Sequence, residues 1–346
     1  MFGFLKQREL RWCRFDPAAV FAHVRNRPLP PGPDGKPIAD GETGRAPAWP
    51  LVGTYFETGP HIGLRRTTPL DQIVQWLQGE RPDYLLTEPS VLEHLAFAFQ
   101  DRPPPPDRLR GLQAVGEAMT PGMRRRIEET FGVLLHQNYG LNEVGLIASM
   151  CLDGGRYHVH TEHCLVEIVD EAGNPCAPGE TGRVLVTTLS NDAMPLIRYD
   201  AGDVAEAVDG PCPCGRILPT FGAAVVRYDD IAAVPADILA LVNALRGAME
   251  RLPPELSKNL RKYQVYRCRD GNFELRLVTV DTPMAELDDH IQTVWRAAVQ
   301  SRPLALRIVE VDHIPLPPSR KYLHFTSDFV SSPASGAATD RGGGPA

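Results

Sequence analysis

The amino-acid sequence predicts an α/β protein of two domains: a parallel α/β layer that runs into a β-rich part, and then a small α+β domain. Three observations predict this. The chain has 346 residues, 43% hydrophobic and 23% charged, enough for about two globular domains. Segments typical of strands and amphipathic helices alternate up to about residue 140, and strand patterns dominate after residue 156.

The first part begins with a Pro- and Gly-rich segment, residues 26–50, which is typical of a long surface loop. Residues 71–79 have apolar side chains at helical spacing, and residues 81–87 predict a short buried strand. Ser90 then precedes a second amphipathic helix, residues 91–100, and we expect Ser90 to be its N-cap.

The order continues as a strand and turn at 112–119, a helix at 120–132 and a strand at 133–140. A strand, a helix and a strand in succession indicate a parallel sheet. Tyr139 and Glu143 therefore fall where a strand ends, at the edge where open α/β sheets bind ligands.

The stretch HQNYGLNEVGL that contains these residues has a composition that is unusual for a buried hydrophobic core. Tyr139 offers a flat ring, and Gly140 allows a close backbone approach. Glu143 is costly to bury unless a cation or a donor meets it. A base or a metal-bound phosphate would use all three residues.

The β-rich part is predicted from strands at 163–170 and 183–189 with a Gly/Pro-rich turn region between them. A further segment, 193–208, contains Gly202 and Asp203, which we expect at a turn between two strands.

After about residue 227 the pattern changes to that of a small domain. Its order of β, α, β, β, α, β is typical of a split βαβ fold. The segments are a short strand, a helix at 237–252, a hairpin at 263–280, a helix at 288–299 and a strand at 306–314. The tail, residues 331–346, lacks large apolar residues and is predicted to be disordered.

Composition excludes several classes of function. The net charge of −7 and the absence of a basic block argue against nucleic-acid binding. No apolar run reaches the roughly 18 residues of a membrane span. The first residues do not have the pattern of a signal peptide, so we expect a cytoplasmic protein. The seven cysteines are then expected to be reduced.

Four of the possible metal ligands have a suggestive spacing. Cys212 and Cys214 lie in the rigid turn PCPCGR, and Cys151 and His158 lie at the two ends of a Gly-containing turn. Together they would form a tetrahedral Cys3His zinc site. The alternative is that these are ordinary buried thiols and a turn histidine.

Five stretches occur in an order that resembles the phenylacetate-CoA ligase branch of the adenylate-forming enzymes, a branch that includes capsule-biosynthesis proteins. They are YLLTEPSVL, VGEAMTPGMRRRIEETFG, NYGLNEVG, GETGRVLVTTLSNDAMPLIRYDAGDV and PCPCGR, and VRYDD at 226–230 resembles the hinge between the domains. The resemblance implies a partial N-terminal domain, 1–225, divided into an α/β part, 1–155, and a β-rich part, 156–225. It also implies a C-terminal domain, 226–330.

The resemblance implies that ATP and Mg²⁺ activate a small or aromatic carboxylic acid as an acyl-adenylate, which is then transferred to coenzyme A. In such a protein, Tyr139 would stack on adenine, Asp203 would accept hydrogen bonds from the ribose hydroxyls, and Glu143 would bind Mg²⁺. Gly140, Asn142 and Arg227 would also approach the nucleotide.

Three further roles follow from the same resemblance. Asp229 would be the hinge residue, and Lys321 would reach the reacting carboxylate and the α-phosphate. The set Cys151, His158, Cys212 and Cys214 would hold a structural zinc ion with no open position for chemistry.

The chain also departs from the family pattern. The first hundred residues contain no Ser/Thr/Gly-rich phosphate loop, only GPDGKPIADGETG, so we expect an N-terminally truncated core. A partner chain or a second copy would then cover the open sheet edge, or the true start would lie upstream. Asp200 adds negative charge near the nucleotide site. The alternatives to an active ligase are a non-catalytic nucleotide-binding or scaffold protein, and a fragment that needs a partner.

Overall fold

The computed structural model divides into two compact units, Met1–Asp229 and Asp230–Ala346. The described residues are 2–26, 29, 37–100, 105–117, 119, 121–170, 172–222, 226–227, 236–250, 252–253, 256, 260–279, 284–300, 302–314 and 325–328. The expected disordered tail, 331–346, lies outside them.

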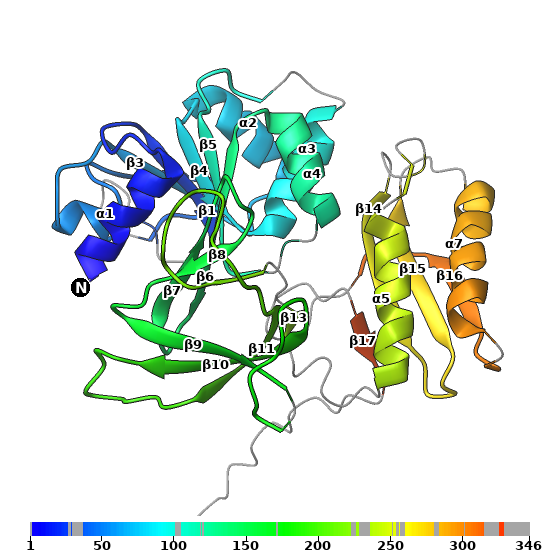
Figure 1. The fold of residues 1–346 in the computed structure, drawn as a ribbon. Helices are drawn as coiled ribbons and strands as arrows, with labels where there is room; N and C mark the ends of the chain where they lie inside the picture. Colours follow the sequence, from blue (N-terminus) through cyan, green and yellow to red (C-terminus); the bar gives the residue numbers. More distant parts are fainter. Residues whose placement is uncertain are drawn as a thin grey trace, which may run out of the picture. The chain divides into compact units, whose positions relative to one another are not determined.

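The first unit is built on a nine-stranded sheet with the order β12-β8-β7-β6-β5-β4-β1-β3-β2 (Figure 1). Its strands are β1 (Phe21–Arg25), β2 (Gly44–Ala46), β3 (His61–Arg65), β4 (Tyr84–Thr87), β5 (Gly111–Ala114), β6 (Leu134–Leu141), β7 (Gly145–Met150), β8 (Tyr157–Val159) and β12 (Thr220–Phe221). Its helices are α1 (Phe2–Cys13), η1 (Val52–Thr54), α2 (Leu70–Glu80), α3 (Pro89–Gln100) and α4 (Pro121–Phe131). Strands β1, β3, β4, β5 and β6 pair in parallel, which confirms the predicted α/β layer.

The two faces of this sheet are covered by different helices. Leu85 pairs with Leu112, and both belong to the buried cluster that α2, α3 and α4 form on one face. The next residues along these strands point the other way, because side chains alternate along a strand. Tyr84 accordingly packs with Phe15 and Trp49 on the opposite face. In Figure 1, α1 lies on that side of β4 and β5, away from α3 and α4.

Two local predictions need correction. The segment 26–50 is not loop throughout, because β2 lies within it and pairs antiparallel with β3. Helix α3 begins at Pro89, so Ser90 lies in its first turn and is not the N-cap. The N–H of Ser90 donates instead to the carboxylate of Glu117, 3.1 Å away.

Strand β6 changes partners along its length. It pairs in parallel with β5 as far as Gln137, and from Asn138 it pairs antiparallel with β7. The strand predicted at 133–140 is β6, which ends at Leu141 with a shift of register after Tyr139, so Tyr139 and Glu143 lie near the end of a strand as predicted. The antiparallel partner satisfies the backbone groups that the parallel layer leaves open.

A separate four-stranded sheet, in the order β13-β11-β10-β9, makes up the β-rich part. Its strands are β9 (Cys164–Val169), β10 (Thr181–Thr188), β11 (Tyr199–Glu206) and β13 (Val226–Arg227). Gly202 and Asp203 were predicted at a turn, but both lie inside β11. Gly202 has φ +66°, and the register between β10 and β11 shifts nearby, so the Gly forms a bulge within one strand.

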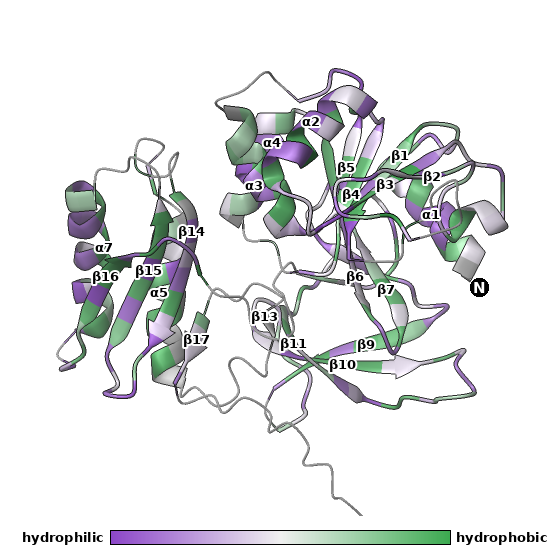
Figure 2. Ribbon diagram, turned by 180° about the vertical axis from the view of Figure 1, so that it is seen from behind, coloured by the Kyte–Doolittle hydropathy of each residue, from purple (hydrophilic) through white to green (hydrophobic). Residues whose placement is uncertain are grey.

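The second unit is an α+β layer. Its elements are α5 (Ala236–Glu250), β14 (Leu260–Arg267), β15 (Phe273–Thr279), α7 (Met284–Val299), β16 (Leu306–Glu310) and β17 (Phe325–Ser327). Apolar and charged residues alternate from Phe273 to Leu277 of β15, and the strands of this unit carry green and purple bands in Figure 2. The α+β class is as expected. However, β15 and β16 pair directly in parallel, so no strand splits this βαβ unit in the described residues.

No helix among the described residues is both long and apolar enough to cross a membrane.

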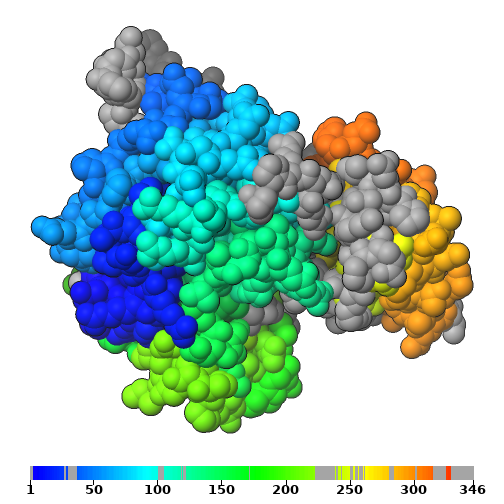
Figure 3. All heavy atoms as spheres, turned by 90° about the horizontal axis from the view of Figure 1, so that it is seen from above, coloured from blue at the N-terminus to red at the C-terminus, as the bar shows by residue number. Residues whose placement is uncertain are grey.

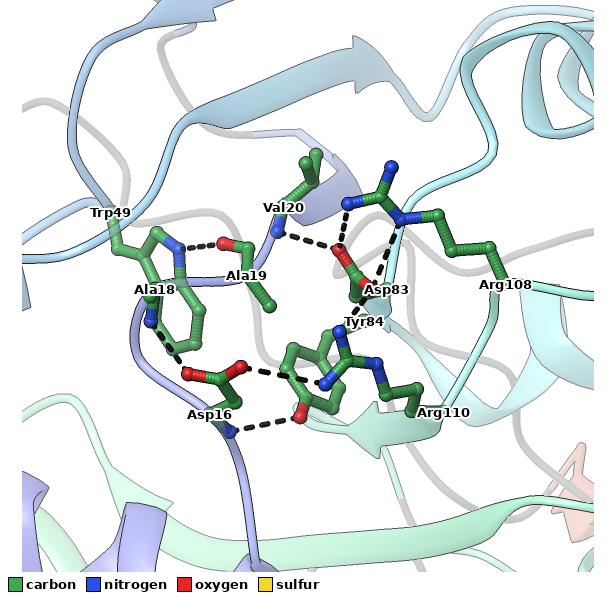
Figure 4. A network of polar contacts seen from close by, with 9 residues as sticks. All are labelled: Asp16, Ala18, Ala19, Val20, Trp49, Asp83, Tyr84, Arg108 and Arg110. Carbon is green, nitrogen blue, oxygen red and sulfur yellow. Dashed lines mark hydrogen bonds and ion pairs between the residues drawn. The ribbon is translucent and has the colours of Figure 1, made fainter.

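A buried carboxylate ties the chain before β1 to β4 and β5 (Figure 4). Asp83 precedes β4, and its side chain is fully buried. It accepts a hydrogen bond from the Val20 amide at 2.8 Å and forms ion pairs with Arg108 at 3.1 Å and Arg110 at 2.9 Å. Burial alone would raise the pKa of Asp83. The hydrogen bonds from Arg108 and Val20, with the charges of both arginines, instead hold this pKa below its usual value.

We predict that Asp83→Asn lowers the free energy of unfolding of the first unit by about 1–3 kcal/mol at pH 7, because charged hydrogen bonds are lost. A carboxyl group with a lowered folded-state pKa stabilises the fold above its unfolded-state pKa of about 3.9. That contribution disappears as pH falls through the lower folded-state pKa. The gap in melting temperature between wild type and variant should therefore shrink below about pH 4.

Scanning calorimetry between pH 7 and pH 3 measures this gap. Asp107→Asn is the control, since Asp107 is exposed and pairs with Arg81 at the surface. Equal melting temperatures for wild type and Asp83→Asn at pH 7 would contradict the assignment.

Candidate functional site

Two residues expected to bind a nucleotide, Tyr139 of β6 and Asp203 of β11, meet in the first unit. The hydroxyl of Tyr139 donates a hydrogen bond to Oδ2 of Asp203 at 2.8 Å. Each residue is only 6% exposed. The Tyr139 ring also packs edge-to-face against Phe221, with ring centroids 5.6 Å apart. A buried carboxylate is thus fixed in one orientation by a phenol that is itself fixed by packing.

The backbone around this pair places other expected residues. Asp203 of β11 is paired with Arg227 of β13 in the strand register, and the side chain of Arg227 lies outside the described part of the structure. Gly140 follows Tyr139, and a Cβ atom there would lie 2.4 Å from the carbonyl oxygen of Gly145. Only glycine therefore fits at position 140 without moving the backbone.

The remaining expected contacts lie at the surface or outside the described residues. Asn142 and Glu143 are exposed on the turn that joins β6 to β7. The carboxylate of Glu143 is therefore available to a solvated cation. Lys321 and Asp229 lie outside the described residues, so their roles stay predictions.

The four possible zinc ligands come together. The ligand atoms of Cys151, His158, Cys212 and Cys214 all lie within 4.8 Å of one another. Cys151 directly follows β7, His158 lies in β8, and the other two cysteines lie in the turn before β12. Sγ of Cys212 is 3.7 Å from Sγ of Cys151, and Sγ of Cys214 is 3.3 Å from Nε2 of His158.

These separations fit a tetrahedral zinc site. With Zn–S of about 2.3 Å and Zn–N of about 2.05 Å, two ligand atoms at corners of a tetrahedron are about 3.5–3.8 Å apart. The backbone is adapted to the sulfur atoms as well. The Gly154 amide donates to Sγ of Cys151 at 3.3 Å, and a Cβ at Gly154 would lie 2.4 Å from Sγ of Cys212.

The pKa values of the cluster differ between its members. Burial raises the pKa of Cys212 to about 11. Burial also opposes ionisation of Cys214, but the Arg216 amide and the neighbouring thiols hold the pKa of Cys214 below its usual value. Burial lowers the pKa of His158, which favours the neutral imidazole that binds metal ions.

Two residues beside the cluster were not foreseen from the sequence. Nη1 of Arg216 is 3.4 Å from Sγ of Cys151, and its guanidinium lies 4.7 Å from the ring centroid of Trp12 in α1. The Trp12 ring is also 5.7 Å from the ring of His158. Figure 3 shows dark-blue N-terminal atoms against lime-green atoms of the chain around residue 210. If the cluster held Zn²⁺, three thiolates around the ion would carry a net charge of −1, which the cation of Arg216 would balance.

A second group of possible ligands, Glu9, Cys13 and His136, lies within 4.8 Å and is buried. Glu9 already has partners: Lys6 Nζ is 2.6 Å from its Oε2, and the amides of Gln113 and Asn138 donate to Oε1. Burial would raise the pKa of Glu9, but the charge of Lys6 contributes most to holding it lower. Glu9 is thus the centre of a network of one ion pair and two hydrogen bonds that holds α1 on β5 and β6.

Comparisons with known proteins agree with this geometry. The family described as AMP-binding enzyme matches residues 50–191. Two relatives are phenylacetate-coenzyme A ligases. The one from Thermus thermophilus is 29% identical over 246 residues, covering 69% of this chain and 52% of the relative. The one from Escherichia coli is 31% identical over 256 residues, covering 66% of this chain and 54% of the relative. The chain thus spans about half the length of the curated relatives that it matches.

Solved structures support the fold. A 2-hydroxyisobutyryl-CoA ligase in the postadenylation state superposes with a TM-score of 0.67 at 17% identity, over 94% of this chain and 69% of that chain. A benzoate CoA ligase from Burkholderia xenovorans gives a TM-score of 0.60 at 15% identity, over 92% of this chain and 63% of that chain. Residues 50–191 thus match the AMP-binding enzyme family, the chain is similar in sequence to phenylacetate-coenzyme A ligases, and its fold is that of solved acyl-CoA ligases.

Proposed function

We propose that the chain binds an adenine nucleotide and takes part in AMP-forming ligation of a carboxylic acid to coenzyme A. The observation that carries this proposal is the buried hydrogen bond between Tyr139 and Asp203. It joins two strands from different sheets and fixes an ionisable acceptor in a fold shared with acyl-CoA ligases.

The proposed reaction has two steps. The carboxylate oxygen of the acid attacks the α-phosphate of ATP, which forms the acyl-adenylate and releases pyrophosphate. The thiol of coenzyme A then attacks the acyl carbon, which forms the thioester and releases AMP. Activation is needed because a free carboxylate is a poor electrophile, whereas AMP is a good leaving group.

The residues take distinct roles in this proposal. Asp203 accepts hydrogen bonds from the ribose hydroxyls, and Tyr139 orients it and offers its ring to the adenine. Stacking on the ring requires that Tyr139, buried here, becomes accessible beside Gly140. Glu143 binds Mg²⁺, which supplies positive charge to the triphosphate when bound.

The remaining proposed contacts follow the family pattern. Asn142 and Arg227 approach the nucleotide, and Lys321 reaches the reacting oxygens. Asp229 serves as the hinge between the two half-reactions.

We also propose that Cys151, His158, Cys212 and Cys214 hold one structural zinc ion. Four protein ligands fill a tetrahedral shell and leave no position for substrate. The ion would join β8 to the turn before β12, and so stabilise the sheet that Tyr139 enters through β6.

A second candidate is a protein that binds the nucleotide without turning it over. One observation favours it: Asp200 adds an exposed carboxylate near Asp203. The partner chain or second copy expected along the open sheet edge stays a prediction.

We predict that Asp203→Asn weakens AMP binding by about tenfold or more, because hydrogen bonds to an ionised acceptor contribute about 1.5–3 kcal/mol. Isothermal titration calorimetry measures the dissociation constant. A nucleotide without ribose hydroxyls, 2′,3′-dideoxy-AMP, should bind wild type and variant about equally. Asp200→Asn is the matched control and should not weaken binding. Equal AMP affinity of wild type and Asp203→Asn would remove Asp203 from the nucleotide site.

For the metal site, we expect about one equivalent of zinc per purified chain, measured by elemental analysis. Cys214→Ser should lower the affinity for the ion, whereas Cys176→Ser, outside the cluster, should not. Removing the ion with a chelator should change the fluorescence of Trp12, and Trp12→Phe should abolish that change. A folded chain with no bound zinc would contradict the assignment.

Carboxylate-dependent exchange of labelled pyrophosphate into ATP tests the first half-reaction. If the chain adenylates an acid, Glu143→Gln and Lys321→Ala should each reduce the exchange rate by about 100-fold or more. Glu129→Gln, exposed on α4, is the control and should keep the wild-type rate. Exchange that is unaffected by both variants would refute their roles. AMP binding without any exchange would favour the second candidate.

A further inference from the structure

The segments that carry the four possible zinc ligands also carry a row of buried apolar side chains. Met150 directly precedes Cys151, and Tyr157 directly precedes His158. Phe221 ends β12, the strand that follows the turn with the other two cysteines. In the strand register, Met150 pairs with Tyr157, and Tyr157 pairs with Phe221. The three side chains therefore lie side by side across β7, β8 and β12.

This row lies on the face of the sheet that carries Tyr139. Tyr139 pairs with Ala148, and Ala148 pairs with Val159, which is two residues from Tyr157 on the same strand. Side chains alternate along a strand, so Tyr157 shares a face with Tyr139, and His158 points to the opposite face. Tyr139 and the row belong to one buried cluster. A link from His158 to Tyr139 must therefore pass through the strands and the row.

Phe221 makes the contacts that this link needs. Its ring is 2% exposed and stacks on the ring of Tyr157, with centroids 5.3 Å apart and an angle of 11° between the planes. The same ring packs edge-to-face against Tyr139, with centroids 5.6 Å apart. Tyr139 in turn donates the hydrogen bond that orients Asp203. Phe221 thus touches both the neighbour of His158 and the phenol that holds Asp203.

The position of Phe221 depends on a short segment. Strand β12 has two residues and lies at the edge of the nine-stranded sheet, where it pairs with β8. The Val159 amide donates to the carbonyl oxygen of Pro219 at 2.9 Å, and Phe221 forms a single bridge with Ala207. Edge segments of this kind open locally at a lower cost than central strands. An ion held by His158 and the cysteine turn would cross-link β8 to the chain that enters β12.

We propose that Phe221 is a positioning residue that couples the cysteine and histidine cluster to the nucleotide site. The inference rests on the proposed AMP and zinc sites. With zinc bound, β12 is held on β8, Phe221 fixes the Tyr139 ring, and Asp203 is presented to the ribose. Without the ion, AMP binding has to order β12 first, which lowers the affinity for AMP. The coupling is reciprocal, so AMP raises the affinity for zinc by the same factor.

The coupling is tested on the full chain, first loaded with zinc and then after removal of the ion by a chelator and dialysis. Isothermal titration calorimetry should show that the loaded chain binds AMP at least about fivefold more tightly, the lower end of typical coupling between sites. Competition with a fluorescent zinc chelator should show the same factor for zinc when AMP is saturating. AMP affinities that agree within about twofold with and without zinc would overturn the coupling.

Variants then assign the coupling to one side chain. Phe221→Leu removes the ring contacts with Tyr139 and Tyr157 but keeps an apolar side chain, and Phe221→Met fills more of the same space. Each should still bind zinc, and its AMP affinities with and without zinc should agree within about twofold. Phe99→Leu is the control, because Phe99 is buried edge-to-face on Phe131 in another cluster, and it should keep the wild-type ratio.

Circular dichroism and melting temperature verify that the variants are folded. A folded Phe221 variant with the wild-type ratio would remove Phe221 from the coupling. A chelated wild-type chain that loses its secondary structure would also overturn the inference, because the ion would then be needed by the fold as a whole.

The outcomes separate this inference from the proposals on which it rests. If AMP binds equally to the loaded and the chelated chain, the coupling fails and the nucleotide site stands. If AMP does not bind to the loaded chain, the proposed function fails, and the coupling falls with it. If the folded chain binds AMP but no zinc, the zinc site and the coupling fail together.

Discussion

Strand β6 is the constraint on which the arrangement of the first unit depends. Its first half pairs in parallel with β5, and its second half pairs antiparallel with β7. A strand that changes partners joins two kinds of layer without a break in the backbone hydrogen bonding. The loop with Glu117 therefore lies on one side of β6. Tyr139 lies on the strand itself, and the cysteine and histidine cluster begins at Cys151, directly after β7.

The buried carboxylates of this unit separate into two kinds by how completely they are satisfied. Asp83 has two arginine partners and a backbone amide, and Glu9 has Lys6 and two side-chain amides. Removing one partner from such a buried network destabilises the fold by more than the intact network stabilises it. These carboxylates therefore fix the positions of segments rather than bind ligands. Glu117 differs, since one of its oxygens receives no hydrogen bond from the described residues.

Sequence patterns predicted the α/β layer and the small α+β unit, because hydrophobic periodicity records which face of an element is buried. Ligand chemistry and the family resemblance grouped Cys151 with Cys212, although the chain between them is long. The error at Gly202 arose where a strand continues through a glycine, since a glycine next to polar residues has the same local pattern in a bulge and in a turn. The contact of Arg216 with Trp12 was not predictable, because it depends on how α1 packs on a distant turn.

Helix α1 is held at two places along one face, and this links the sheet to the metal cluster. Near its middle, Glu9 is bound by amides from β5 and β6. One turn later, Trp12 packs against Arg216, whose guanidinium also contacts Sγ of Cys151. The cation of Arg216 gains most from Trp12 and the sulfur atoms when the thiolates are ionised, the form that a bound zinc ion enforces. Metal binding would therefore strengthen the packing of α1, and α1 would shield the cluster from solvent in return.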